Sequence, residues 1–135
     1  MGVEIRDYNK HDRFALMSLS EDEWRPQILA TVLSIKENNS IEKCLVAEAD
    51  GDIVGFIYGF VLPNKTLIPE FMYVVPNARK NGVGAELIKQ LELTSGCTAS
   101  MIFYNKSMHC FYEHQGYLAG ENLEVAVKEI GGTSE

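Results

Sequence analysis

Two apolar runs separated by a short polar turn constrain the fold of this chain most. The runs, Leu45 to Ala49 and Ile53 to Leu62, are rich in Val, Ile, Phe and Tyr, and Asp50-Gly51-Asp52 lies between them. Glycine tolerates the positive φ that a tight hairpin turn requires, so the pattern predicts an antiparallel β-hairpin. Gly55 and Gly59 lie inside the second run, where glycine is typical of a bulge or of the close approach of another backbone.

A third strand and a helix are predicted after the hairpin. Leu67 to Val75 is again apolar, and we expect Pro69 at the first residue of that strand, because a proline deeper in a central strand removes a ladder donor. After Pro76 and a polar loop, apolar residues recur at helical spacing from Val83 to Leu91, with polar side chains on the opposite side. Gly96 is expected to end this helix.

The flanking segments complete an alternating set of strands and helices. They comprise a first strand at Val3 and Ile5, a helical region from Phe14 to Leu33 that ends at Asn38-Asn39-Ser40, a strand from Thr98 to Tyr104, a short helix from Met108 to His114 closed by Gly116, and a last strand in which Leu123, Val125 and Val127 alternate. This order predicts an α/β fold with a mixed, mostly antiparallel sheet and helices on its faces. We expect a single domain over residues 1–130 and a frayed tail over 131–135.

Length and charge narrow the range of functions. A chain of 135 residues makes one domain with a sizeable core. Nineteen acidic residues against twelve basic ones give a net charge of -7, which opposes nucleic-acid binding because neutralising phosphates supplies that affinity. The longest apolar run, Ile53 to Leu62, is about half of what a bilayer span needs, and the first residues lack the apolar stretch of a secretory signal. We therefore expect a cytoplasmic protein that binds neither nucleic acid nor membrane.

Cysteine and histidine form no metal-site pattern. The three cysteines, Cys44, Cys97 and Cys110, are far apart and make no C-x-x-C pair, so we interpret them as buried thiols. His109, Cys110 and His114 are close in sequence, but a structural zinc site needs paired ligands from a second segment. We expect no metal, and we expect His109 and His114 to be exposed helix residues.

The passage from the third strand into the predicted helix carries the chemistry. It reads Val74-Val75-Pro76-Asn77-Ala78-Arg79-Lys80-Asn81-Gly82-Val83-Gly84-Ala85, with two basic residues and no acidic one between Glu70 and Glu86. A helix N-terminus offers unpaired backbone N–H groups and the positive end of the helix dipole, and glycines there let a phosphate approach. The spacing lacks the P-loop pattern and the third glycine of the dinucleotide fingerprint, which disfavours ATP and NAD. Alternatively, Gly82 and Gly84 merely permit a tight turn.

The pattern V-x-P-x-x-R-x-x-G-x-G at Val74 to Gly84, followed by Asn105 and by Phe111-Tyr112-Glu113-His114-Gln115-Gly116-Tyr117, resembles the GNAT superfamily of N-acetyltransferases. Arg79, Gly82 and Gly84 match the R/Q-x-x-G-x-G/A signature of that family. The resemblance extends over nearly the whole chain and implies a single-domain GNAT-like fold. It also implies that acetyl-coenzyme A (acetyl-CoA) is the cosubstrate.

The resemblance further implies where acetyl-CoA binds, in a cleft where two strands splay apart. Its pantetheine arm would pair like an added strand with the backbone at Met72, Tyr73 and Val74, and Asn105 would contact the arm from the next strand. Its pyrophosphate would rest on the backbone N–H groups of the loop and first helical turn. The cofactor-binding residues implied in this segment are Arg79, Lys80, Asn81, Gly82, Val83, Gly84 and Ala85.

Acetylation of an amine needs a base, an oxyanion donor and an acid. Glu70 lies four residues before Val74, so strand periodicity places it on the side of Met72 and Val74 if no bulge intervenes, where several enzymes of the family have a general base. An N–H group near Val74 would hold the oxyanion. Tyr112 matches the family tyrosine that gives a proton to the leaving thiolate. As alternatives, Tyr112 is a packing side chain and Glu70 a solvated carboxylate.

The predicted activity is transfer of the acetyl group of acetyl-CoA to a primary amine by direct attack. The acceptor, a small-molecule amine or a peptide or protein amine, would be selected by the helical region from His11 to Asn39, in which Glu21-Asp22-Glu23 precedes Trp24. Tyr8, Phe14 and Trp24 are expected in the core or in the wall of the acceptor pocket. The alternatives are a catalytically inactive acyl-CoA sensor or interaction module with the same fold, and an anion-binding module for nucleotides. The sequence also leaves a homodimer open.

Overall fold

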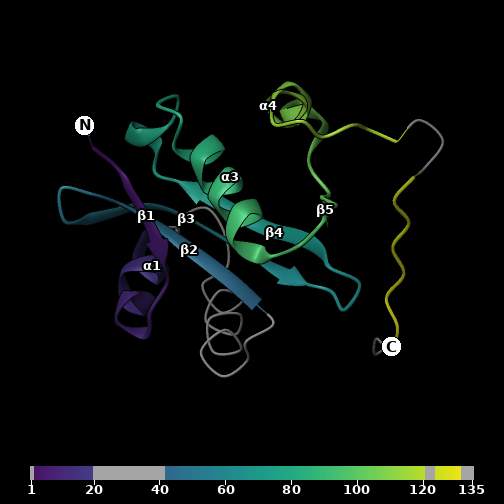
Figure 1. The fold of residues 1–135 in the computed structure, drawn as a ribbon, viewed down its shortest axis with the longest axis horizontal. Helices are drawn as coiled ribbons and strands as arrows, with labels where there is room; N and C mark the ends of the chain where they lie inside the picture. Colours follow the sequence, from purple (N-terminus) through teal and green to yellow (C-terminus); the bar gives the residue numbers. More distant parts are fainter. Residues whose placement is uncertain (1, 20–41, 121–123, 132–135) are drawn as a thin grey trace. The chain divides into compact units, whose positions relative to one another are not determined.

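The computed structural model describes residues 2–19, 42–120 and 124–131 (Figure 1). The later part of the predicted helical region, with Glu21-Asp22-Glu23 and Trp24, lies outside the described residues. The chain divides into two compact units, Met1–Tyr104 and Asn105–Glu135, and the expectation of one domain over residues 1–130 stays a prediction. Within the described ranges, no helix combines the length and the apolar character that crossing a bilayer requires.

The first unit is built on a five-stranded sheet with the spatial order β1-β2-β3-β4-β5. The strands are β1 (Glu4–Asp7), β2 (Glu42–Ala49), β3 (Asp52–Val61), β4 (Thr66–Val74) and β5 (Ala99–Ser100). The first four strands pair antiparallel with their neighbours, whereas β5 pairs parallel with β4. The predicted α/β class and the mixed, mostly antiparallel sheet are therefore confirmed.

The hairpin between β2 and β3 has the turn that its sequence predicts. Ala49 pairs with Asp52, so two residues form the centre of the turn. Asp50 has a φ of 52° and Gly51 a φ of 85°. Two successive positive φ angles are typical of the type I′ turn, whose twist matches that of the flanking strands.

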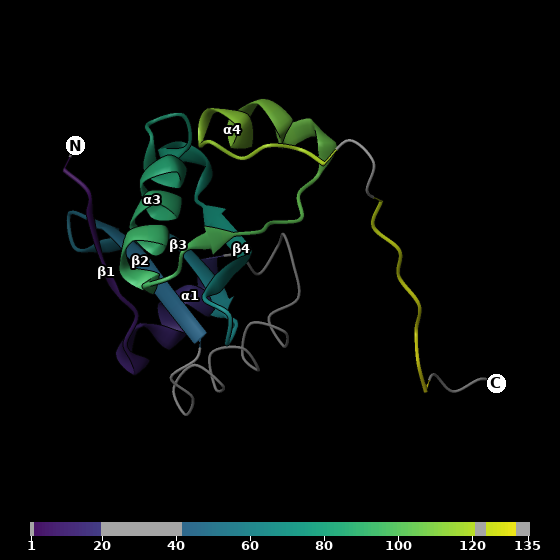
Figure 2. The ribbon, with the colours of Figure 1, turned by 45° about the vertical axis from the view of Figure 1, so that its right-hand side comes forward.

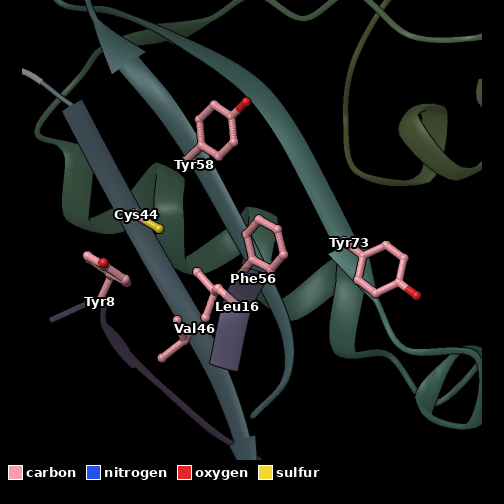
Figure 3. Close-up of a cluster of buried hydrophobic side chains, with 7 residues drawn as sticks. All are labelled: Tyr8, Leu16, Cys44, Val46, Phe56, Tyr58 and Tyr73. Carbon is pink, nitrogen blue, oxygen red and sulfur yellow. The ribbon is translucent and has the colours of Figure 1, made fainter. Parts of the chain in front are cut away.

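One face of the sheet is covered by α1 (Arg13–Leu19), which follows a short 3-10 turn, η1 (Lys10–Asp12). Leu16 of α1 packs against side chains that alternate along the strands (Figure 3), because successive side chains of a strand point to opposite faces. The buried cluster comprises Tyr8, Leu16, Cys44, Val46, Phe56, Tyr58 and Tyr73. Tyr8 is thus a core residue as predicted, whereas Phe14 is 83% exposed and is not one.

The opposite face of the sheet is covered by α3 (Val83–Ser95), which contacts β2, β3 and β4 (Figures 1 and 2). Its buried side chains recur at the predicted helical spacing and are Val83, Leu87, Ile88 and Leu91. Gly96 caps the C-terminus of the helix with a φ of 74°, as expected for a left-handed glycine at this position. Helices on both faces of the sheet are therefore confirmed.

Gly55 of β3 lets α3 and the end of β4 approach closely. A Cβ atom at Gly55 would lie 2.9 Å from the Tyr73 carbonyl oxygen and 3.4 Å from Leu87 Cδ1. Gly55→Ala is therefore expected to lower the free energy of unfolding by about 1–3 kcal/mol, the usual cost of overpacking, as measured by urea denaturation. Gly2→Ala is the control, because a Cβ atom there meets nothing within 4 Å. Equal stability of the two variants would contradict the prediction.

Pro69 lies inside β4, as its fourth residue, so the prediction that it begins the strand is wrong. In the described part of the chain, β4 and β5 pair only at Thr66–Leu67 and Ala99–Ser100, and the Met101 N–H donates to the Leu67 carbonyl at 2.9 Å. In a parallel ladder, the next bond would run from the nitrogen of residue 69 to the Met101 carbonyl. Proline has no N–H group to make that bond, so the ladder between β4 and β5 ends at Pro69. The proline is tolerated because its nitrogen faces the edge that β5 leaves.

One predicted strand is shorter than expected and another does not form over its described residues, both for reasons of pairing. The strand from Thr98 to Tyr104 is reduced to Ala99–Ser100, because the parallel ladder ends at Pro69. The last strand does not form over its described residues, since 124–130 have no strand conformation and Val125 and Val127 are largely exposed. An alternating pattern becomes a strand only where another strand pairs with it, and no strand within the described ranges does so.

The second unit contains a short helical segment. A 3-10 turn, η3 (Lys106–Met108), leads directly into α4 (His109–His114), so the predicted helix from Met108 to His114 is confirmed. Gly116 has a φ of 94°, and its N–H donates to the Glu113 carbonyl at 3.0 Å. Gly116 therefore closes the helix as predicted.

Arg6 ties β1 to η1 and β2. Its guanidinium donates two hydrogen bonds of 2.9 Å to the Asp12 carboxylate and one of 2.9 Å to Glu48. Asp12 is buried and also accepts a hydrogen bond from the Asn9 N–H at 2.9 Å. The hydrogen bonds from Arg6 hold the pKa of the Asp12 carboxyl below its usual value.

Asp12→Asn is expected to lower the free energy of unfolding at pH 7 by about 1–3 kcal/mol, because Arg6 loses the buried one of its two charged partners. The folded pKa of Asp12 is lowered, so its stabilisation is present above the unfolded pKa and is lost as the pH falls through the folded value. The stabilities of wild type and variant should therefore converge below about pH 4 in urea denaturation. The exposed Asp52→Asn is the control. A gap that is as large at pH 3 as at pH 7 would refute the assignment.

Candidate functional site

The loop between β4 and α3 turns sharply before the helix begins. It contains the 3-10 turn η2 (Pro76–Ala78), and Lys80 and Gly82 adopt left-handed φ angles of 70° and 81°. Gly82 is the N-cap of α3, and a Cβ atom on it would meet nothing within 4 Å. A left-handed backbone favours glycine, so the turn-forming role of Gly82 is real. The turn-forming role does not prevent a phosphate group from approaching the backbone at Gly82, because a Cβ atom placed there would meet nothing within 4 Å.

The first turn of α3 supplies hydrogen-bond donors. The first intrahelical bond runs from the Glu86 N–H to the Gly82 carbonyl at 3.0 Å, so the N–H groups of Val83, Gly84 and Ala85 precede the helical ladder. The aligned dipoles of a 13-residue helix make this end positive, and the side chains of Arg79 and Lys80 on the preceding loop are exposed. This arrangement can bind a phosphate group.

The edge of β4 provides the second half of the site. The Val75 N–H donates to the Val54 carbonyl at 2.9 Å. Because backbone groups alternate along an antiparallel strand, those of Tyr73 also face β3, whereas those of Met72 and Val74 face the opposite edge, which β5 has left. Of the three residues predicted to pair with a ligand, Met72 and Val74 are therefore suitably oriented. The Tyr73 side chain lies in the core on the α1 side (Figure 3).

Arg79 connects the loop to the end of β4. Its Nε atom donates a hydrogen bond of 2.6 Å to the Val74 carbonyl oxygen. Its Cζ atom lies 5.3 Å from the centre of the Tyr73 ring, within the range of a cation–π contact. The arginine of the family signature is thus bonded within its own unit to the strand that precedes the loop.

Glu70 is the extra residue of a β-bulge in β4. Tyr58 pairs with Phe71 and Gly59 pairs with Pro69, so Glu70 has no paired residue on β3. The periodicity that placed Glu70 on the side of Val74 required an uninterrupted strand, and a bulge changes the phase of the alternation. The Glu70 side chain is exposed, and its role as general base stays a prediction.

Gly59 admits this bulge. A Cβ atom at Gly59 would lie 2.7 Å from the Ile68 carbonyl oxygen and 3.0 Å from Pro69 Cα. The close backbone approaches that the sequence indicated at Gly55 and Gly59 are therefore both confirmed. The sequence analysis missed that Gly59 and Pro69 together shape the strand beside Glu70. The sequence did contain a signal for the bulge, because Pro69 lies within a strand pattern and the preceding strand contains Gly59.

Asn105 and Tyr112 belong to the second unit. Asn105 is the N-cap of η3, and its side-chain oxygen accepts a hydrogen bond from the Ser107 N–H at 2.9 Å. Tyr112 is buried in α4 and makes edge-to-face contacts with Phe111 and Tyr117, with ring centroids 4.9 and 5.9 Å away. Burial raises the pKa of the Tyr112 phenol, which keeps the hydroxyl protonated at neutral pH. Their roles toward a cosubstrate stay predictions.

The cysteines differ from their prediction. Only Cys44 is buried, and Cys97, after the end of α3, is partly exposed. Cys110 is exposed, because only one face of the short α4 helix is covered. His109 and His114 are exposed as predicted. Among the described residues, no group of three or more His, Cys, Asp and Glu side chains is placed to hold a metal ion.

The family model of the acetyltransferase (GNAT) domain matches residues 40–118, which is more than half of the chain. This chain belongs to the GNAT acetyltransferase family. No curated protein sequence matches it significantly.

Solved structures share this fold at low sequence identity. AAC(6')-Iy in complex with the bisubstrate analogue CoA-S-monomethyl-acetylneamine is 18% identical and superimposes with a TM-score of 0.80 over 96% of this chain and 100% of that chain. The aminoglycoside antibiotic 6'-N-acetyltransferase AAC(6')-IG from Acinetobacter haemolyticus is 17% identical, with a TM-score of 0.75 over 94% and 99% of the two chains. Ribosomal-protein-alanine N-acetyltransferase from Brucella melitensis biovar Abortus 2308 is 18% identical, with a TM-score of 0.73 over 95% and 100%. The predicted GNAT-like fold is confirmed.

Proposed function

We propose that this protein is an N-acetyltransferase that transfers the acetyl group of acetyl-CoA to a primary amine by direct attack. The observation that carries the proposal is the junction of β4 and α3, where, among the described residues, a strand edge that β5 has left leads into a helix N-terminus whose first N–H groups precede the helical ladder. An extended arm and a phosphate group are the two ligand features that such a junction can bind together. The CoA moiety named in the AAC(6')-Iy complex has both features.

The residues of the junction would hold acetyl-CoA in two places. The backbone groups of Met72 would pair with the pantetheine arm, as an added strand does, and the Val74 N–H faces the same edge. The N–H groups from Lys80 to Ala85 would donate hydrogen bonds to the pyrophosphate, and the exposed positive charge of Lys80 would attract it. Asn105 would contact the arm through its side-chain nitrogen, since its oxygen caps η3.

The bound cosubstrate supplies an activated acetyl thioester, and the chain's own side chains handle the protons. An amine is mostly protonated at neutral pH, so a base must remove a proton before the nitrogen can attack. We assign this step to Glu70, whose carboxylate is exposed. The Val74 N–H would donate to the developing oxyanion, and Tyr112 would give its phenolic proton to the departing thiolate. The raised pKa of Tyr112 ensures that this proton is present.

The acceptor we favour is a small-molecule amine. Two of the proteins with similar structures, AAC(6')-Iy and AAC(6')-IG, are named as aminoglycoside acetyltransferases, which supports this class, and the ribosomal-protein-alanine N-acetyltransferase leaves a protein amine as the alternative. At under 25% identity, these names carry no finer assignment to this chain. The cytoplasmic location and a homodimer stay predictions.

Thermal unfolding with ligands tests the proposal directly. A ligand at about 100 times its dissociation constant stabilises a protein by about 2.7 kcal/mol, so acetyl-CoA and CoA should raise the melting temperature, whereas ATP and NAD should not. Equal shifts with ATP would indicate a general phosphate site, and no shift with CoA would refute the proposal. Release of free thiol with a panel of amines then separates an enzyme from an inactive acyl-CoA sensor, which would bind acetyl-CoA without turnover.

A further inference from the structure

The Arg79 side chain has a partner that its place in a phosphate-binding segment does not predict. It follows the strand by five positions and folds back, so that Nε donates to the Val74 carbonyl at 2.6 Å. A bond this short from a cationic donor is among the stronger hydrogen bonds of a protein. The guanidinium also lies 5.3 Å from the centre of the buried Tyr73 ring, which restricts its orientation.

The acceptor of this bond lies on the open edge of β4. The backbone groups of Val74 face away from β3, as the alternation from the Val75 hydrogen bond to Val54 requires. Among the described residues, the end of β4 is paired on one side only, with β3, up to the hydrogen bond from the Val75 N–H to the Val54 carbonyl. The bond from Arg79 therefore fixes the end of the edge and joins it to the loop before α3.

We propose that Arg79 is a positioning residue that holds the end of β4 in place for the pantetheine arm, and that it does not act as a ligand of the pyrophosphate. This inference rests on the proposed function. It assigns the charge contact with the pyrophosphate to Lys80, the next residue, which is exposed and has a left-handed φ of 70°. It also leaves both backbone groups of Met72 for the arm and the Val74 N–H for the oxyanion, since Arg79 occupies the Val74 carbonyl.

Two substitutions of equal length separate the hydrogen bond from the charge. The side-chain nitrogen of glutamine is as many bonds from Cα as Nε of arginine, so Arg79→Gln keeps a donor at the position that bonds Val74 and removes the charge. Arg79→Met has a similar length and no donor. Lys80→Gln removes the neighbouring charge alone and is the matched control for a phosphate contact.

The experiment measures KM and kcat for each variant with acetyl-CoA and with acetyl-pantetheine, which lacks the pyrophosphate. Arg79→Met should raise KM about tenfold for both substrates by the same factor, since it loses one charge-assisted hydrogen bond that shapes the pantetheine edge. Arg79→Gln should stay within about threefold of wild type for both. Lys80→Gln should raise KM for acetyl-CoA alone.

Two results would overturn the inference. One is an equal impairment of Arg79→Gln and Arg79→Met that is confined to acetyl-CoA, because it would indicate a charge contact with the pyrophosphate. The other is wild-type behaviour of Arg79→Met with both substrates. If the wild type neither binds nor uses acetyl-CoA, the proposed function fails, and the inference is judged by the exchange rate of the Arg79 Nε proton in NMR spectra of the free protein. Exchange as fast as in free arginine would then overturn it.

Discussion

Replacement of Tyr112 by phenylalanine is expected to lower kcat for acetyl transfer by about 100-fold or more, the usual scale for removing a general acid. The ring and its contacts with Phe111 and Tyr117 are retained, so the domain should fold and its affinity for CoA should stay within a few-fold. The phenol is buried and its pKa is raised, so in the wild type it remains a proton donor at neutral pH. Steady-state kinetics together with CoA titration separate the two effects.

Tyr117→Phe is the matched control for this loss. It removes the same hydroxyl group from a ring that packs edge-to-face on Tyr112, with centroids 5.9 Å apart. We expect this variant to retain wild-type kcat. If Tyr112→Phe were no slower than Tyr117→Phe, Tyr112 would be the packing side chain of the alternative interpretation and would have no part in the mechanism.

Gly82→Asp is expected to weaken CoA binding by about 100-fold or more. The new carboxylate would lie at the N-terminus of α3, beside the donors of Val83, Gly84 and Ala85, and would repel the pyrophosphate. The space around Gly82 accommodates a side chain, because a Cβ atom there meets nothing within 4 Å. The loss should be seen in CoA titration, with a folded protein confirmed by circular dichroism.

Two controls isolate the charge from the backbone strain. Gly82→Asn has the same shape without the charge and should bind CoA at least tenfold more tightly than Gly82→Asp. Gly96→Asp makes the same substitution at the other end of α3, where φ is 74° and a Cβ atom also meets nothing within 4 Å. It should cost at least as much stability, because a carboxylate at the C-terminus of a helix opposes the helix dipole, and it should leave CoA binding intact. Equal CoA affinity of Gly82→Asp and the wild type would eliminate the proposed phosphate site.

Local sequence patterns were sufficient where neighbours along the chain decide the structure. The type I′ turn at Asp50 and Gly51 follows from the φ preferences of its residues. The helix α3, which Gly96 caps, follows from its apolar spacing. Few distant contacts can override these local preferences. The same holds for the glycine-rich N-terminus of α3, because the donors of a first helical turn exist wherever a helix begins. These features already defined the phosphate half of the candidate site.

Contacts between distant residues decided the rest. The sequence by itself determined the order of the described elements as far as α4, the turn, the helix α3 and the family signature at Arg79, Gly82 and Gly84. Only the tertiary structure placed Pro69 opposite a departing strand, put Glu70 in a bulge and bonded Arg79 to Val74. The physical reason is that a strand exists only through its partner, so its register, its bulges and its open edge depend on hydrogen bonds to residues elsewhere in the chain.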